Sequence, residues 1–192
     1  GGGEAHARAA DVREQKRQWN HAPTLAVYGL NAAAFGSGEG GGRRANGVEV
    51  NGMGACPSAM EGTRAILAGK GHDVAGFPTI THNQRNIATL IVETSAGHMV
   101  EADHLIDIAE ASLSSPTYEL LKRGDETALV MHAHENPRFV EDVVREMLHA
   151  FVARYGALPE DTLIIARSAA EESIHKHNAF AERTTTLAEL RT

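Results

Sequence analysis

The chain has 192 residues, of which 42% are hydrophobic and 22% charged, and this is the composition of a globular domain with an adequate core. Its formal net charge is −7 and it has no run of Lys or Arg, which argues against a broad nucleic-acid-binding face. No stretch approaches the roughly 20 apolar residues of a membrane span, so we expect no membrane partner. Cys56 is the single cysteine, which excludes an internal disulfide and is typical of a cytoplasmic protein.

The N-terminal part, residues 1–45, is predicted to hold an arm, a strand and a glycine-rich loop. Residues 1–20 are charged and Ala-rich, and the stretch "AADVREQKRQW" within them is weakly helical. The apolar run "TLAVYGLNAAAF" at 24–35 predicts a strand. The following "GSGEGGGRRANG" has neither a Walker Lys-Ser/Thr nor the strand–GxGxxG–helix context of a nucleotide loop, so we interpret it as a flexible loop.

Residues 46–192 are predicted to form the main unit, in which strands are mixed with helices. Strands are predicted from β-branched or alternating sequence at 47–57, 86–94, 126–135 and 161–168. The segment "SAMEGTRAILAG" predicts a first helix that ends at Gly69 or Gly71.

Two longer segments have the spacing of amphipathic helices. The first covers 101–123, with a break expected at Pro116. In the second, Asn136 is the expected N-cap, Pro137 the first helical residue and Gly156 the C-terminal stop. Its apolar stripe consists of Phe139, Val140, Val143, Val144, Met147, Leu148, Phe151 and Val152. This pattern fits an α+β fold, an antiparallel sheet with two long helices packed on one face.

Residues that carry chemistry stand near the ends of these predicted elements. Cys56 lies in a strand-to-helix turn, where a helix N-terminus favours the thiolate, although a lone cysteine is as often a buried apolar residue. His82 immediately precedes a strand, and Glu126 is expected in a turn at the head of one. Glu141 lies in the first turns of the last long helix, opposite the apolar stripe. The histidines interpreted as surface or interface residues are His72, His98, His104, His132, His134 and His149.

The stretch "EESIHKHNAF" at 171–180 concentrates titratable groups near the end of the chain. On a strand His175 and His177 would share a face, whereas on a helix Glu172 and His175 would do so. A metal site, acid–base chemistry and a polar surface strand all fit this spacing. Thiolate, imidazole and carboxylate together suit Zn(II), Fe(II) or Mn(II), any of which would activate water.

Five segments, read in order, resemble one family. "ACPSAMEGTR", "THNQR", "YELLKRGDE", "ENPRFVEDVVRE" and "ESIHKHNAFA" are similar to the successive signatures of type IB GTP cyclohydrolases. This metal-dependent group includes bacterial folate-pathway enzymes and the archaeal Fe(II)-dependent methanopterin-pathway enzyme. The match runs from about residue 45 to residue 180, and the long gap between Cys56 and His82 resembles the archaeal branch.

The resemblance implies a tunnelling fold, or T-fold: an antiparallel sheet backed by two helices, which several units assemble into a barrel. It also implies hydrolysis at C8 of GTP, with opening of the imidazole ring and release of formate, in pterin or folate biosynthesis. A divalent metal, Fe(II), Mn(II) or Zn(II), is the implied cofactor.

Carried over onto this sequence, the family's site residues fall into three groups. The implied metal ligands are Cys56, His82, Glu126 and His175. Glu172 is implied as a further ligand or proton carrier, and His177 and His82 as catalytic residues. The implied substrate-binding residues are Glu141, which would hold the guanine edge, and Arg85 and Lys122, which would meet phosphate.

The sequence also departs from the family. Ser58 stands where the usual CPC motif has its second cysteine, which could alter the metal preference. Roughly the first third of the family's sequence, with its "HMSR"-type motif, is not matched, so we expect a homo-oligomer or a heteromer with a chain that supplies that half. Two alternatives remain: an enzyme acting on another purine nucleotide, and a non-catalytic partner subunit of a cyclohydrolase.

Overall fold

The computed structural model describes the backbone of residues 5–15 and 24–35, and backbone and side chains of 42–76 and 80–191. Within these residues the strands form one seven-stranded antiparallel sheet, in the order β1-β2-β3-β4-β6-β7, with β5 paired to β3. The strands are β1 Ala5–Gln15, β2 Thr24–Phe35, β3 Arg43–Ala55, β4 Asn83–Ser95, β5 Ser115–Pro116, β6 Leu163–Glu171 and β7 Ala179–Thr186. The helices are α1 Pro57–Gly69, α2 Ala102–Ala111, α3 Arg123–Glu135, α4 Val140–Tyr155 and α5 Leu187–Leu190. The predicted α+β class and antiparallel sheet are confirmed.

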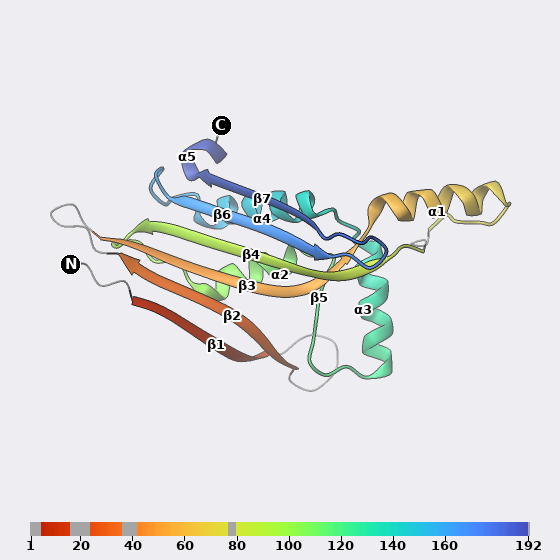
Figure 1. Cartoon of the computed structure of the whole chain (residues 1–192), viewed down its shortest axis with the longest axis horizontal. Helices are drawn as coiled ribbons and strands as arrows, with labels where there is room; N and C mark the ends of the chain where they lie inside the picture. Colours follow the sequence, from red (N-terminus) through yellow and green to blue (C-terminus); the bar gives the residue numbers. More distant parts are fainter. Residues whose placement is uncertain (1–4, 16–23, 36–41, 77–79, 192) are drawn as a thin grey trace.

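Helices α2 and α4 lie along one face of the sheet, whereas α1 and α3 stand at one of its ends (Figure 1). α2 packs on β3 and β4, and α4 packs on β6 and β7. Burial alternates along the strands as this layering requires: Ala88, Leu90 and Val92 of β4 are fully buried, while the residues between them are only partly buried. The hydrophobic core therefore lies between the sheet and these two helices.

The strand register brings three chain segments to the same end of the sheet. Ala55 at the end of β3 pairs with Asn83 at the start of β4. Arg85 pairs with Glu171 at the end of β6. The residues just beyond these ends are Cys56, His82 and Glu172. Segments more than 80 residues apart in sequence are thus neighbours because of antiparallel pairing alone.

Several sequence-based predictions are confirmed. The strands expected at 24–35, 86–94 and 161–168 correspond to β2, β4 and β6, the last two with shifted or extended ends. The helix expected after Cys56 is α1, and it ends at Gly69. Gly156 is the C-cap of α4, as its position predicts.

The weak helix expected within residues 1–20 is wrong for its described part. Ala5–Gln15 form β1, which pairs with β2 along its whole length. Pairing with a long neighbouring strand overrides a weak local helix preference. Residues 36–41 of the expected flexible loop lie outside the described residues, and Arg43–Gly47 belong to β3 instead. β3 pairs with β2 on one side and β4 on the other, so its start is extended by both.

The helix expected at 101–123 ends at Ala111, before Pro116. The chain turns back to the sheet because the buried Ser114 hydroxyl accepts a hydrogen bond from the Ala55 N–H at 3.1 Å. The strand expected at 126–135 is wrong, since this segment forms most of the helix α3. Of the described side chains of α3, Ala133 alone is buried, so no apolar stripe signals the helix.

The last long helix begins at Val140, three residues after the expected Pro137, and its N-cap is Phe139 rather than Asn136. The Arg138 N–H donates to the Ala55 carbonyl at 3.0 Å, so the backbone here is attached to the end of β3 before the helix starts. The buried residues of α4 are Val143, Val144, Met147, Leu148 and Phe151, which confirms most of the predicted stripe.

The division of the chain at residues 45 and 46 stays a prediction. β2 and β3 pair across it within one sheet. Among the described residues, no helix has the length and apolar character that crossing a lipid bilayer requires.

Candidate metal centre

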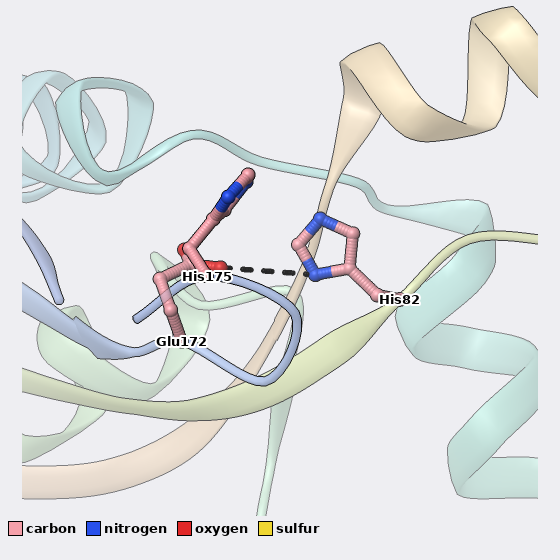
Figure 2. Close-up of side chains that lie close together, drawn as sticks. All are labelled: His82, Glu172 and His175. Carbon is pink, nitrogen blue, oxygen red and sulfur yellow. Dashed lines mark ion pairs between the residues drawn. The ribbon is translucent and has the colours of Figure 1, made fainter. Parts of the chain in front are cut away.

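Three side chains converge at the end of the sheet that β3, β4 and β6 share. His82, Glu172 and His175 each offer a metal-ligating atom, and these atoms all lie within 4.8 Å of one another. Figure 2 shows the Glu172 carboxylate facing the His82 ring, with the His175 side chain beside it. His82 precedes β4, whereas the other two residues follow β6. The site is therefore built by the register of the sheet.

Hydrogen bonds to the backbone of Cys56 fix its position next to this group. The Cys56 N–H donates to the His82 carbonyl at 3.2 Å, and the Thr81 hydroxyl donates to the Cys56 carbonyl at 2.7 Å. Cys56 is the N-cap of α1, and its Sγ accepts from the Ala59 N–H at 3.5 Å. This is the strand-to-helix turn that the sequence predicts, with Pro57 at the first helical position.

The carboxylate of Glu172 is nearly enclosed by protein. Its side chain is 10% exposed, and its Oε2 lies 3.8 Å from Nδ1 of His82, whose side chain is 11% exposed. Within the described part of the chain, Oε2 is the buried side-chain polar atom that has no hydrogen-bond partner. A buried acceptor without a donor is costly, and a bound cation or a proton would remove that cost.

The segment after β6 is a turn rather than a strand. The Glu172 N–H donates to Asn178 Oδ1 at 3.2 Å, which closes the turn before β7 begins. Within it the rings of His175 and His177 are stacked at 5.4 Å, and the His175 ring lies edge-on to His82 at 6.1 Å. The turn thus presents His175 to His82 while keeping His177 in contact with His175.

The donor set suits a borderline divalent cation. Two imidazoles and one carboxylate are ligands for Zn(II), Fe(II) and Mn(II). The unpartnered Glu172 Oε2 is the observation that favours a cation at this position. The residues of this chain therefore fit the metal that the sequence predicts.

The other two predicted metal ligands, Cys56 and Glu126, do not belong to the group formed by His82, Glu172 and His175. Cys56 adjoins His82 through the backbone but does not belong to the group of described residues whose ligand atoms lie within 4.8 Å. Glu126 is also outside that group; it lies in the first turn of α3, not at the head of a strand, and is exposed. The C-terminal end of α3 approaches the β3–α1 junction, whereas its first turn points away from it (Figure 1).

The predicted substrate-binding residues are all exposed. Glu141 lies in the first turn of α4, as predicted. Arg85 lies on β4 with its Nε 4.0 Å from Glu171 Oε2. Lys122 is the N-cap of α3. These residues are accessible to a ligand, and the structure does not bring them into contact with the three converging side chains.

One residue of the site was missed by the sequence analysis. Gln84 lies two residues after His82, and its amide contacts both His82 and Glu172. Its place inside "THNQR" is a signal, but only the pairing of β4 with β6 shows that it faces Glu172.

Two shifted pKa values lie elsewhere in the molecule. Hydrogen bonds from the Arg43 guanidinium to Glu93 and Asp161 raise its pKa above the ordinary value. A hydrogen bond from the Thr185 hydroxyl, and a second from the Thr186 N–H, lower the pKa of Glu189. Arg43 begins β3, at the opposite end of that strand from Cys56, and it ties β3 to the start of β6.

Comparison of the sequence with known proteins finds a matching family. The family described as "Type I GTP cyclohydrolase folE2" matches residues 4–181. The chain is 46% identical to the GTP cyclohydrolase MptA of Methanothermobacter thermautotrophicus over 159 residues, which cover 78% of this chain and 50% of the relative. It is 45% identical to the protein of the same name from Methanoregula boonei, covering 77% of this chain and 49% of the relative.

A third relative, the GTP cyclohydrolase MptA of Methanobrevibacter smithii, is 43% identical over 78% of this chain and 51% of its own length. The chain thus spans about half the length of the curated relatives that it matches.

Proposed function

Because the chain belongs to the type I GTP cyclohydrolase (folE2) family, we propose that it forms the metal-binding half of a GTP cyclohydrolase. The proposed reaction hydrolyses the purine at C8, opens the imidazole ring and releases formate, in pterin or folate-type biosynthesis. The proposed cofactor is Fe(II), Mn(II) or Zn(II).

The convergence of His82, Glu172 and His175 carries this proposal. Three chemically suited side chains meet at the end of the sheet, and one of them has a buried oxygen without a partner. We propose that Cys56, His82, Glu126 and His175 hold the metal, with Glu172 as a further ligand or proton carrier. When bound, a divalent cation supplies the activation of water that attack on C8 requires.

The other proposed roles concern proton transfer. Glu172 is 10% exposed beside His82, so it can hold a proton away from bulk water and deliver it to a ring nitrogen. His177 is exposed and stacked on His175, a position from which it can exchange protons with solvent. His82 is the second residue of the site that can take part in proton transfer, through Nδ1, which faces Glu172.

Substrate recognition is proposed for the exposed residues. The Glu141 carboxylate would accept hydrogen bonds from the ring N–H and amino group of guanine, which adenine cannot offer in the same arrangement. Arg85 and Lys122 would contact the triphosphate.

We also propose that the active protein is an oligomer. β1 and β7 are the end strands of the sheet, so each has one paired neighbour among the described residues. A free strand edge is a ready partner for a strand of another chain. A barrel with the tunnelling fold, made from copies of this chain or from this chain and one that supplies the other half, would pair these edges.

The test is formate release from GTP by the purified chain, anaerobically, with Fe(II), Mn(II) or Zn(II) added in turn. We expect formate that is lost in the Cys56→Ala and His175→Ala variants. His98→Ala is the matched control, because His98 is an exposed histidine just beyond the opposite end of β4 from His82. Formate release that is unchanged in Cys56→Ala and His175→Ala would contradict the proposed site.

The end strands β1 and β7, each with one paired neighbour among the described residues, favour one further candidate, a subunit that needs a second polypeptide. If the chain binds metal but releases no formate from GTP, adding the polypeptide that corresponds to the other half should restore activity. If formate release from GTP is still absent after this addition, other purine nucleoside triphosphates become the substrates to assay. A chain that binds no stoichiometric metal would instead be a non-catalytic partner subunit.

A further inference from the structure

The amide of Gln84 bridges two residues of the metal centre. Its Oε1 lies 2.9 Å from His82 Nδ1, and its Nε2 donates to Glu172 Oε1 at 3.3 Å. Gln84 lies on β4, and Glu172 directly follows Glu171 of β6, which pairs with Arg85. The bridge is thus set by the same strand pairing that brings the site together.

The chemistry of an amide fixes the direction of both hydrogen bonds. A carbonyl oxygen only accepts, so the proton in the contact with Gln84 Oε1 is carried by His82 Nδ1. In the neutral imidazole the other nitrogen, Nε2, is then unprotonated and can bind a cation. Figure 2 shows this nitrogen pointing away from the Glu172 carboxylate.

The same amide determines which Glu172 oxygen remains free. Oε1 accepts from Gln84, whereas Oε2 lies 3.8 Å from His82 Nδ1 without a hydrogen bond. Since His82 Nδ1 donates its proton to Gln84 Oε1, this proton is not donated to the Glu172 carboxylate. Gln84 therefore holds both His82 and Glu172 by one hydrogen bond each.

We propose that Gln84 is a positioning residue of the metal centre. It holds His82 in the Nδ1–H tautomer, so that Nε2 is the nitrogen offered to the metal, and it holds Glu172 through Oε1, which leaves Oε2 beside His82 without a hydrogen bond. The metal part of this inference rests on the proposed function, whereas the tautomer of His82 is a property of the metal-free chain. Outer partners of this kind orient a ligating imidazole and raise its basicity.

The first experiment measures the tautomer in the metal-free chain, from the ¹⁵N chemical shifts of the two His82 ring nitrogens. It uses a Glu172→Ala, Ser173→Ala background, which removes the Glu172 carboxylate and the Ser173 hydroxyl that lies 3.5 Å from His82 Nδ1. With Gln84 present we expect Nδ1–H, and with Gln84→Leu added we expect the proton to shift toward Nε2. Gln84→Glu keeps an acceptor and should retain Nδ1–H, which also covers the case that the leucine variant does not fold.

The second experiment measures Zn(II) and Mn(II) affinity of the chain with native Glu172, by competition with a chromophoric chelator. Gln84→Leu should weaken binding by about 10- to 100-fold. Asn83→Ala is the matched control, because Asn83 is exposed and points to the opposite face of β4 from Gln84. Its affinity should equal that of the unmodified chain.

The two experiments separate this inference from the proposed function. If the unmodified chain binds no metal, the proposed function fails, and the tautomer still decides the role of Gln84. If the tautomer is the same with Gln84 and with leucine, or if Gln84→Leu binds metal as tightly as Asn83→Ala, the inference is wrong.

Discussion

Single atoms decide what the end of the sheet can bind. Glu172 directly follows β6, and this one position places its carboxylate beside His82. Glu171, one residue earlier, is exposed and faces Arg85 instead. The alternation of a strand thus separates a surface carboxylate from an enclosed one. The enclosed carboxylate, that of Glu172, can bind a cation or a proton because its Oε2 lacks a hydrogen-bond partner among the described residues.

Replacing Glu172 by glutamine should have opposite effects on stability and on metal binding. Without metal, Glu172→Gln removes the carboxylate oxygen Oε2 that has no hydrogen-bond partner among the described residues, so the free energy of unfolding should rise by about 1 kcal/mol. With Zn(II) or Mn(II), the affinity should fall, because a negative ligand is lost. Urea unfolding in chelator and a metal titration measure the two effects. Glu171→Gln is the control and should change neither; a Glu172→Gln variant that is less stable without metal would contradict this account.

At the level of the elements, β5 can pack closely on β3 because residue 52 is a glycine. β5 pairs with β3 at Gly52 and Met53. A Cβ on Gly52 would lie 2.4 Å from Leu113 Cδ1 and 2.8 Å from the Ser115 carbonyl oxygen. This contact holds the segment after α2 against β3, three residues before Ala55 and four before Cys56.

Gly52→Ala should therefore destabilise the chain. The added methyl group meets a backbone oxygen that cannot move without breaking the β3–β5 pairing, and overpacking of this kind costs about 1–3 kcal/mol. The midpoint of urea unfolding measures the effect. Gly62→Ala in the exposed α1, where an added Cβ meets nothing within 4 Å, is the control and should be neutral or stabilising. Equal midpoints for Gly52→Ala and the unmodified chain would show that β5 is not tightly packed on β3.

The short C-terminal helix α5 contributes a pH dependence. Glu189 accepts hydrogen bonds from the Thr185 hydroxyl and the Thr186 N–H, which lower its pKa from 4.5 in the folded state. The unfolded chain then binds the proton more readily, so this contribution to stability is present above pH 4.5 and is lost as the pH falls through the folded pKa.

Glu189→Gln should consequently destabilise the chain at neutral pH, and the difference from the unmodified chain should shrink below about pH 4.5. Unfolding midpoints measured from pH 3 to pH 7 test this, with Glu182→Gln, an exposed position on β7, as the control for loss of a negative charge. A destabilisation that is constant across this range would exclude Glu189 as its source.

The arrangement of the whole molecule leaves apolar side chains on its outer surface. Phe180 on the end strand β7 is 69% exposed, with the Arg167 guanidinium 5.6 Å from its ring centroid. In the proposed oligomer, this strand would pair with another chain and cover the ring.

Phe180→Lys should therefore weaken self-association, because it places a second cation beside Arg167 at the proposed contact. Sedimentation velocity over a range of concentrations measures this. Met99→Lys is the control, since Met99 is 63% exposed and lies just beyond the other end of the sheet, in the connection after β4. If Phe180→Lys sediments as the unmodified chain does, β7 is not an assembly edge.

The sequence by itself determined the features that depend on local pattern. The apolar runs identified β4 and β6, and "GACPSAM" identified the strand-to-helix turn at Cys56. The residues of "THNQR" and "ESIHKH" identified the histidines of the site. These features can be predicted from the sequence because each depends on a few neighbouring residues.

The tertiary structure alone decided the features that depend on distant partners. Ala5–Gln15 become a strand because β2 offers a full-length neighbour. Residues 126–135 become a helix, α3, although only Ala133 is buried and no stripe is visible. Gln84 joins His82 to Glu172 because β4 pairs with β6. In each case the deciding interaction spans residues far apart in the chain, and a local pattern contains no information about which distant segment will supply it.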